Sequence, residues 1–250
     1  MTFIEIEQHD GIATLTLARG KVNAINGALM AELAGVLDQL SADPAVRALV
    51  LTGRGKFFSF GFDVPEILTF AKEDFVKYAT EFTELYRKLF LFPKPVIASL
   101  NGHTVAGGCM LALACDTRIM VRGNAKISLN EINFGSSVFA GSTEMLRFLV
   151  GGVNATAILY SGAMYSAEEA QSLSLVQATA IDETLAAETK TIASTLAAKD
   201  RVAFASIKSL LRSEIGEAMK RRDAASVEEM VEIWFSETTR EQLRNIQIHL

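Results

Sequence analysis

The stretch Leu100–Asp116 reads LNGHTVAGGCMLALACD, and the interpretation of the whole chain starts from it. It follows a β-like run over Pro95–Leu100 and turns through Asn101-Gly102. The residues Cys109–Ala114 are apolar and contain neither Gly nor Pro, which is typical of a buried helix. The sequence therefore predicts a strand, a turn and a helix that begins near the pair Gly107-Gly108.

The glycine pair allows two interpretations. Without a Cβ atom, its backbone N–H groups can come close to a ligand. The first N–H groups of a helix lack intrahelical partners, and the macrodipole favours negative charge at that end. Such an end can hold a phosphate, a carboxylate or a developing oxyanion. Alternatively, the glycines only let the helix pack closely on a strand. This stretch by itself favours neither interpretation.

Length and composition exclude several classes of protein. The 250 residues allow one large domain or two small ones, and the apolar half of the composition is enough for a sizeable core. The net charge of −5, without a long basic run, argues against a nucleic-acid partner. No apolar run is long enough to span a bilayer, so we expect no membrane association. Residues Met1–Gln8 alternate like a strand and do not resemble a signal peptide.

Cysteine and histidine usage gives further limits. Cys109 and Cys115 lie in or beside one predicted helix, so we expect no structural disulfide and a reduced, cytoplasmic setting. The three histidines are scattered and lack the spacing of metal ligands: His9, His103 and His249. We therefore expect no metal site.

Hydrophobic periodicity predicts a mixed α/β order followed by helices. The expected strands are Phe3–Gln8, Ile12–Leu17, Ala48–Leu51 and Lys126–Leu129, and the expected helices include Asn26–Leu40, Lys72–Leu91, Thr143–Val150, Thr156–Ser161 and Ala167–Leu173. The chain from Ile181 onward reads as wholly helical. We therefore predict a core over residues 1–195, which carries the active site, and a helical oligomerisation region over residues 196–250.

Three stretches together resemble one family. They are Lys21–Asn26 (KVNAIN), Phe58–Asp63 (FSFGFD) and Asn101–Asp116, and they occur in order at fitting separations. Each motif is weak alone, but the ordered set is similar to the crotonase (enoyl-CoA hydratase/isomerase) superfamily. The likeness covers roughly residues 3–180. It implies an α/β fold built as a spiral of ββα units, a C-terminal helical trimerisation region, and assembly as a homotrimer or a dimer of trimers.

The resemblance also implies an acyl-CoA thioester substrate, whose CoA is part of the substrate, and no separate cofactor. In this family two backbone N–H groups hold the thioester oxygen, and here they belong to Phe62 and Gly107. Two fixed donors and a helix dipole aimed at that oxygen stabilise the enolate that forms when an α-proton leaves. The same likeness implies substrate or CoA contacts for Lys21, Val22, Ala24, Phe60, Gly61, Asp63, Val64 and Asn130.

Two positions decide which reaction of the family we expect. Hydratases use two glutamates, and the first lies three residues after the second oxyanion glycine. Here that position is Met110, whose thioether cannot act as a general base. The second glutamate is matched by Glu131. One carboxylate without a partner suits proton shuttling, so Glu131 is the predicted catalytic base.

The sequence in this region most resembles the Δ3,Δ2-enoyl-CoA isomerase branch, in which one glutamate takes a proton from C2 and returns it at C4. Alternatives stay open: enoyl-CoA hydration, acyl-CoA hydrolysis, or a catalytically silent CoA-binding protein. An apolar environment would raise the pKa of Glu131 and make it a better base.

Other side chains receive secondary roles. We expect Asp63 to hold its loop or cap the next helical turn, and His103 to support the site rather than transfer protons. Arg19 or Lys21 could meet a phosphate of CoA. Phe134, Val138 and Phe139 are candidates for the wall of an acyl pocket.

Overall fold

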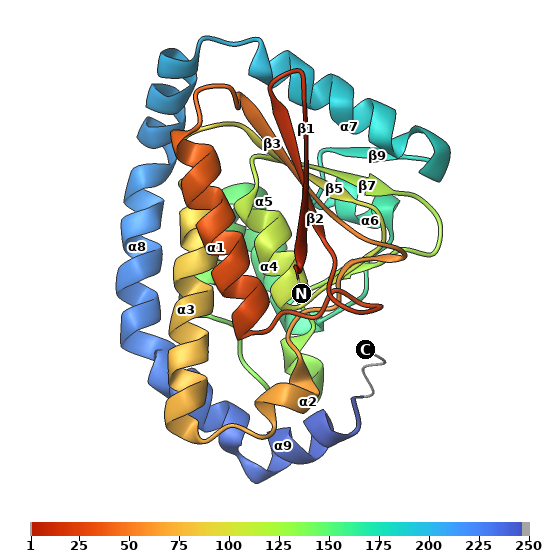
Figure 1. Cartoon of the computed structure of the whole chain (residues 1–250). Coiled ribbons are helices and arrows are strands. Elements are labelled where there is room, and N and C mark those ends of the chain that lie inside the picture. The colour runs from red at the N-terminus through yellow and green to blue at the C-terminus, as the bar shows by residue number, and fades with distance from the viewer. Residues whose placement is uncertain (1, 247–250) are drawn as a thin grey trace.

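The computed structural model describes residues 2–246, and its centre is a six-stranded sheet (Figure 1). The strand order is β1-β2-β3-β5-β7-β9. The strands are β1 (Ile4–His9), β2 (Ile12–Leu17), β3 (Ala48–Gly53), β5 (Val96–Leu100), β7 (Thr117–Val121) and β9 (Ala178–Ala180). β1 and β2 pair antiparallel through the turn at Asp10-Gly11, and the other neighbours pair parallel.

A second, three-stranded parallel sheet has the order β4-β6-β8. Its strands are β4 (Phe57–Ser59), β6 (His103–Val105) and β8 (Ile127–Ser128). Along the chain, each strand of the small sheet follows a strand of the large one, and one or two helices come next: β3-β4-α2-α3, β5-β6-α4 and β7-β8-η1-α5. The expected spiral of ββα units is thereby confirmed.

Helices surround both sheets. They are α1 (Gly27–Ala42), α2 (Val64–Ile67), α3 (Lys72–Phe90), α4 (Gly107–Ala114), the 3-10 helix η1 (Glu131–Phe134), α5 (Ala140–Ser161), α6 (Ala167–Ser172), α7 (Asp182–Ala197), α8 (Arg201–Phe235) and α9 (Glu237–Arg244). Figure 1 shows α1, α3 and α8 side by side, while α7 lies against β3, β5 and β7. Within residues 2–246, no helix is both long and apolar enough to cross a membrane.

The first helix shows how directly the apolar pattern determines packing. Asn26 caps α1 by accepting the Leu29 N–H at 3.0 Å, which satisfies one of the unpaired donors at a helix start. The residues that α1 buries are those that the periodicity predicted: Leu29, Met30, Leu33, Val36, Leu37 and Leu40. The capping box at Ser166 and Glu169, which starts α6, also matches its sequence signature.

Other local predictions were wrong or incomplete. The two helices expected over Thr143–Val150 and Thr156–Ser161 are both present within α5, separated by a kink where Gly151 takes φ 75° and ψ 164°, but each is longer than expected. The short strands β4, β6, β7 and β9 were not predicted. A three-residue strand such as β6 offers too few alternating positions for a period to be recognised.

The C-terminal helices pack on the core of their own chain. Met230 and Trp234, which lie in the expected oligomerisation region, are buried against residues of the same chain. Deeper in α8, the Lys208 and Arg212 side chains pair with Asp116 at 2.7 and 3.1 Å. The expected boundary at residue 195 falls inside α7.

Candidate active site

The three predicted catalytic residues follow the three strands of the small sheet. Phe62 comes shortly after β4, Gly107 after β6 and Glu131 after β8. Because the strands are parallel, their carboxyl ends meet at one edge of the sheet, which is where α/β proteins commonly bind ligands. The small sheet therefore brings together groups that lie far apart in the sequence.

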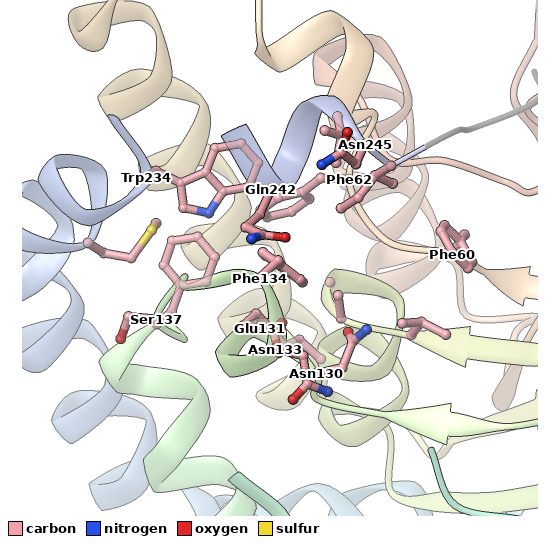
Figure 2. Close-up of a pocket in the computed structure, with 18 residues that line it drawn as sticks. Phe60, Phe62, Asn130, Glu131, Asn133, Phe134, Ser137, Trp234, Gln242 and Asn245 are labelled. Carbon is pink, nitrogen blue, oxygen red and sulfur yellow. The ribbon is translucent and has the colours of Figure 1, made fainter. Parts of the chain in front are cut away.

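These residues line a cavity of about 280 Å³ (Figure 2). Its wall includes the predicted residues Phe60, Phe62, Val64, Gly107, Asn130 and Glu131, together with Met110. Phe134 and Phe139 also line it, as predicted, whereas Val138 is not among the lining residues. The cavity is mainly apolar and aromatic, with a few polar groups, which is the usual composition of a small-molecule site.

The Phe62 amide is oriented by its neighbours. The Ile25 N–H donates to the Gly61 oxygen at 2.8 Å, and the Asp63 N–H donates to the Ile25 oxygen at 2.9 Å. Phe62 is thus bridged to Ile25 by the residues on either side of it, so its own N–H faces the opposite edge of the chain. It donates to no other group among residues 2–246, and neither does the Gly107 N–H at the start of α4. Both donors are available to a ligand.

Gly61 lets the loop that carries Phe62 approach α4. It has φ 94°, a conformation that residues with a side chain rarely adopt. A Cβ atom on Gly61 would lie 3.0 Å from the Val105 oxygen and 3.2 Å from the Gly107 nitrogen. Close approach of the two donor-bearing segments therefore depends on this glycine.

Gly107 and Gly108 differ in what their missing side chains allow, so each fits one of the two interpretations of the glycine pair. A Cβ atom on Gly108 would lie 2.5 Å from the Ser59 oxygen, so Gly108 permits close helix–strand packing. A Cβ atom on Gly107 would lie 2.9 Å from the Phe62 ring. Between the strand and the pair, Ala106 takes φ 49° and ψ −121°, a strained backbone held at the mouth of α4.

The dipole of α4 is neutralised at the end remote from the cavity. Arg118 donates to the Cys115 oxygen at 2.9 Å, and Arg212 donates to the Ala114 oxygen at 3.1 Å. Both guanidinium groups are buried, and all eight residues of α4 are buried. The positive end of the dipole is left facing the cavity, where it favours a developing negative charge.

Glu131 is the first residue of η1 and is buried, with 6% of its surface exposed. Burial raises the pKa of its carboxyl to about 8, and its Oε2 atom has no hydrogen-bond partner among the described residues. Its own backbone contributes a smaller, opposite effect on the pKa. An unpaired, desolvated carboxylate in a cavity has the properties of a general base.

The structure also holds η1 in place. The Gly135 N–H donates to the Ile132 oxygen at 3.2 Å, and the Asn133 side chain donates to the Gly162 oxygen at 2.7 Å. The adjacent Asn130 presents a buried Oδ1 atom without a partner among residues 2–246. This oxygen can accept a hydrogen bond from a substrate.

The C-terminal helices complete the cavity, which was not predicted. The additional lining residues are Met230 and Trp234 from α8, and Gln242, Asn245 and Ile246 from α9 and beyond. Thr239 on α9 donates to the Gly135 oxygen at 2.8 Å, and Arg240 donates to the Leu68 oxygen at 2.7 Å. These bonds fix α9 to both η1 and the segment after α2. The apolar character of the tail was visible in the sequence, but its partner was not.

Asp63 stabilises the donor-bearing loop, as predicted. Its carboxylate accepts the Glu66 N–H at 3.2 Å, which caps α2, and lies 2.6 Å from the Arg19 guanidinium. Arg19 is therefore engaged by the protein. Val22 and Ala24 are buried, Lys21 is exposed, and none of the three lines the cavity.

His103 lies in β6, outside the lining of the cavity. Partial burial, aided by the charge of Lys126, lowers its pKa. Its ring lies 5.2 Å from that of Phe57, between centroids. This placement agrees with a supporting role and not with proton transfer in the cavity.

Comparisons with known proteins identify the family. The description of the matching family is enoyl-CoA hydratase/isomerase, and the match covers residues 7–245. A probable enoyl-CoA hydratase of Bacillus subtilis (strain 168) is 35% identical over 216 residues, covering 85% of this chain and 83% of that protein. An enoyl-CoA hydratase/isomerase of Xanthobacter autotrophicus Py2 superposes with a TM-score of 0.87 at 26% identity, over 97% of this chain and 92% of the other.

Human mitochondrial Δ3,Δ2-enoyl-CoA isomerase superposes with a TM-score of 0.92 over 97% of this chain and 96% of the other. At 23% identity, this likeness concerns the fold alone. The family match, the fold and the B. subtilis relative agree with the three ordered sequence motifs. The chain therefore belongs to the enoyl-CoA hydratase/isomerase family, that is, to the crotonase superfamily.

Proposed function

We propose that the protein is an acyl-CoA double-bond isomerase that converts a 3-enoyl-CoA into a 2-trans-enoyl-CoA. One observation carries this proposal: among the described residues that line the cavity, Glu131 alone has a titratable side chain. The position that would supply a second carboxylate is Met110, which also lines the cavity and is buried. A single base can move a proton between two carbons, whereas hydration in this family relies on two carboxylates.

The reaction follows from the groups present. The Glu131 carboxylate takes a proton from C2, and the electrons of that C–H bond form an enolate on the thioester oxygen. The N–H groups of Phe62 and Gly107, with the dipole of α4, stabilise that charge. Glu131 then delivers the proton to C4, the enolate collapses, and the double bond lies between C2 and C3. The substrate supplies the CoA, and no further cofactor is required.

Hydration is the rival, because the B. subtilis relative bears the name of a probable hydratase. Purified protein is assayed in parallel with a 3-enoyl-CoA and with a 2-trans-enoyl-CoA. Isomerisation creates the absorbance of the conjugated thioester, hydration removes it, and hydrolysis releases the free CoA thiol. We expect only the first signal. If the 2-trans-enoyl-CoA loses absorbance at least as fast as the 3-enoyl-CoA gains it, the protein is a hydratase and not an isomerase. No change in any of the three signals would indicate a silent CoA-binding protein.

Gly107 supplies the test of the oxyanion donors. Gly107→Pro removes the proposed N–H donor and is expected to lower turnover by about 100- to 1,000-fold. The new side chain also crowds the Phe62 ring, and proline restrains the strained Ala106. The Gly107→Pro variant therefore requires a check of folding by circular dichroism.

Gly107→Ala is the matched control, because it keeps the N–H donor and adds a Cβ atom that crowds the same ring. The difference in turnover between the folded Ala and Pro variants reports the donor itself. Equal turnover in the two would mean that the Gly107 N–H does not hold the thioester oxygen.

For assembly, we propose a homotrimer or a dimer of trimers, formed through exposed residues of α8. Ile207, Leu210 and Leu211 fall on one helical face because they are spaced at three and four residues. All three are large, apolar and exposed, and Leu210 is 83% exposed. Such a cluster marks a contact surface rather than a solvated one.

For the compartment, we propose the cytoplasm, because Cys109 and Cys115 are both buried and free of disulfides.

The double variant Leu210→Glu/Leu211→Glu is expected to sediment as a monomer. Truncation at residue 195 is a poorer test, because it would remove the ion pairs of Asp116 with α8. Ile6→Glu, at a half-exposed apolar residue of β1, is the control for added charge. An unchanged mass for the folded double variant would contradict assembly through this face.

A further inference from the structure

Trp234 places an unused hydrogen-bond donor in the wall of the cavity. Only 6% of this residue is exposed, and its ring lies 4.6 Å from that of Phe75, between centroids. Figure 2 shows the indole nitrogen turned toward the cavity, on the side of Gln242. It donates to no other group within residues 2–246, although a buried indole N–H usually has a partner. A ligand in the cavity would therefore meet a donor here.

A second polar group lies near this donor. Gln242 belongs to α9, and Figure 2 shows its side-chain amide directed into the same part of the cavity. The amide has no hydrogen-bond partner among the described residues and can both donate and accept. Thr239, one turn earlier, anchors α9 to Gly135, so Gln242 extends from a fixed helix. The two groups form a polar end of the cavity, on the side that α8 and α9 supply.

This polar end does not suit a hydrocarbon chain. Without a substrate, water can satisfy the indole N–H and the amide. A hydrocarbon would displace the water from the indole N–H of the buried Trp234 and leave that donor without a partner, which is costly. Gln242 is exposed, so its amide can keep water and contributes attraction for an oxygen rather than a penalty against a hydrocarbon. An oxygen on the acyl chain would accept from Trp234 and exchange a hydrogen bond with Gln242.

The charges of the cavity decide which kind of oxygen. No Lys or Arg is among the described residues that line it. A carboxylate would be buried without a counterion, in the same cavity as the acidic Glu131. A hydroxyl or a carbonyl carries no such penalty and matches the two neutral partners.

We propose that the preferred acyl group carries a neutral oxygen, a hydroxyl or a carbonyl, at its end remote from the thioester, bound by the Trp234 N–H and the Gln242 amide. The inference rests on the proposed function only in that the cavity receives the acyl chain. It goes beyond that function by naming the substrate class.

The test measures binding, not turnover, so that it is separate from the isomerase assay. Saturated acyl-CoAs that cannot isomerise are compared by calorimetry at butanoyl, hexanoyl and octanoyl length. Each length is tested with a terminal methyl, a terminal hydroxymethyl and a terminal carboxylate. At the fitting length, we expect the hydroxylated chain to bind about tenfold more tightly than the hydrocarbon, the effect of one well-made hydrogen bond. The carboxylate should bind most weakly.

Trp234→Phe removes the N–H while keeping an aromatic ring against Phe75, and Gln242→Leu removes the amide. In Trp234→Phe, the dissociation constant of the hydrocarbon chain divided by that of the hydroxylated chain should fall from about ten to about one. A wild-type protein that binds hydrocarbon and hydroxylated chains equally at all three lengths would overturn the inference, and so would a preference that both variants retain.

The outcomes separate the two proposals. A binding preference without isomerisation would support the proposed neutral oxygen and contradict the isomerase activity. Isomerisation without a binding preference would support the isomerase activity and contradict the proposed neutral oxygen. Absence of binding by every acyl-CoA would overturn both.

Discussion

Glu131→Gln is expected to lower the rate of isomerisation by about 100- to 10,000-fold, the usual contribution of a general base. The substitution keeps the shape of the side chain and removes the group that we propose accepts the C2 proton. Because Glu131 alone among the described cavity residues is titratable, no neighbouring side chain can take over. The measurement is the appearance of the conjugated thioester from 3-enoyl-CoA, with acyl-CoA binding followed in parallel and expected to be nearly unchanged.

Two control variants sharpen this experiment. Glu131→Asp keeps a carboxylate but withdraws it by one methylene, so its activity should lie between those of wild type and the Gln variant. Glu168→Gln changes an exposed carboxylate on α6 and should have no effect. Glu131→Gln with activity within twofold of wild type would show that another group moves the proton.

The raised pKa of Glu131 predicts a characteristic pH dependence of activity. Only the ionised carboxylate accepts a proton, and burial sets its pKa to about 8. The value of kcat/KM should therefore rise with pH and level off above pH 8.

The same raised pKa predicts that the free energy of unfolding decreases as pH rises, while activity increases. Below the unfolded-state pKa of about 4.3, the carboxyl is protonated in both states and has no effect. Between that value and the folded-state pKa of about 8, only the unfolded chain loses the proton, so the free energy of unfolding decreases as pH rises. Each pKa unit corresponds to about 1.4 kcal/mol, a few kcal/mol in total. Glu131→Gln should lack this decrease and be more stable than wild type at pH 8 and above.

Apolar periodicity was sufficient to predict α1 and α3 with nearly correct bounds, whereas the region of α7, α8 and α9 was predicted as helical without bounds. The buried face of α1 is determined locally by spacing, so the residues that it buries could be predicted from the sequence. The proposed catalytic set could not be predicted in this way, because Phe62, Gly107 and Glu131 meet through the small sheet. Two of its strands, β4 and β6, have three residues each and were not recognised, whereas β8 lies within the expected strand Lys126–Leu129. The family likeness, and not a physical pattern in the sequence, linked these three residues.

The C-terminal helices α8 and α9 show more clearly what periodic sequence patterns cannot predict. Met230 and Trp234 are apolar residues of a helix, and their spacing indicates a buried face without naming what covers it. In the structure, that face closes the cavity of the same chain. The Thr239 hydroxyl reaches Gly135 across a large separation in sequence, and nothing in either local sequence indicates this contact. Contacts of this kind follow from the complete fold.

Met110→Glu is expected to add weak hydration of 2-trans-enoyl-CoA. Met110 lies one helical turn after Gly107 on α4 and lines the same cavity as Glu131. A carboxylate there would give the site the second acid–base group that hydration in this family uses. Two carboxylates in one cavity also push their pKa values apart, so that one group can act as an acid while the other acts as a base.

The new charge replaces a buried thioether, of which 2% is exposed, so the free energy of unfolding should fall by a few kcal/mol. Met110→Gln is the matched control, because it has the same shape and a similar polarity but cannot move a proton. The measurement is the loss of conjugated thioester absorbance in both purified, folded variants. Since the positive end of the α4 dipole and both backbone donors are retained, any hydration in the Glu variant alone comes from the added carboxylate. Equal rates in the two variants would mean that a carboxylate at position 110 cannot orient water against the substrate.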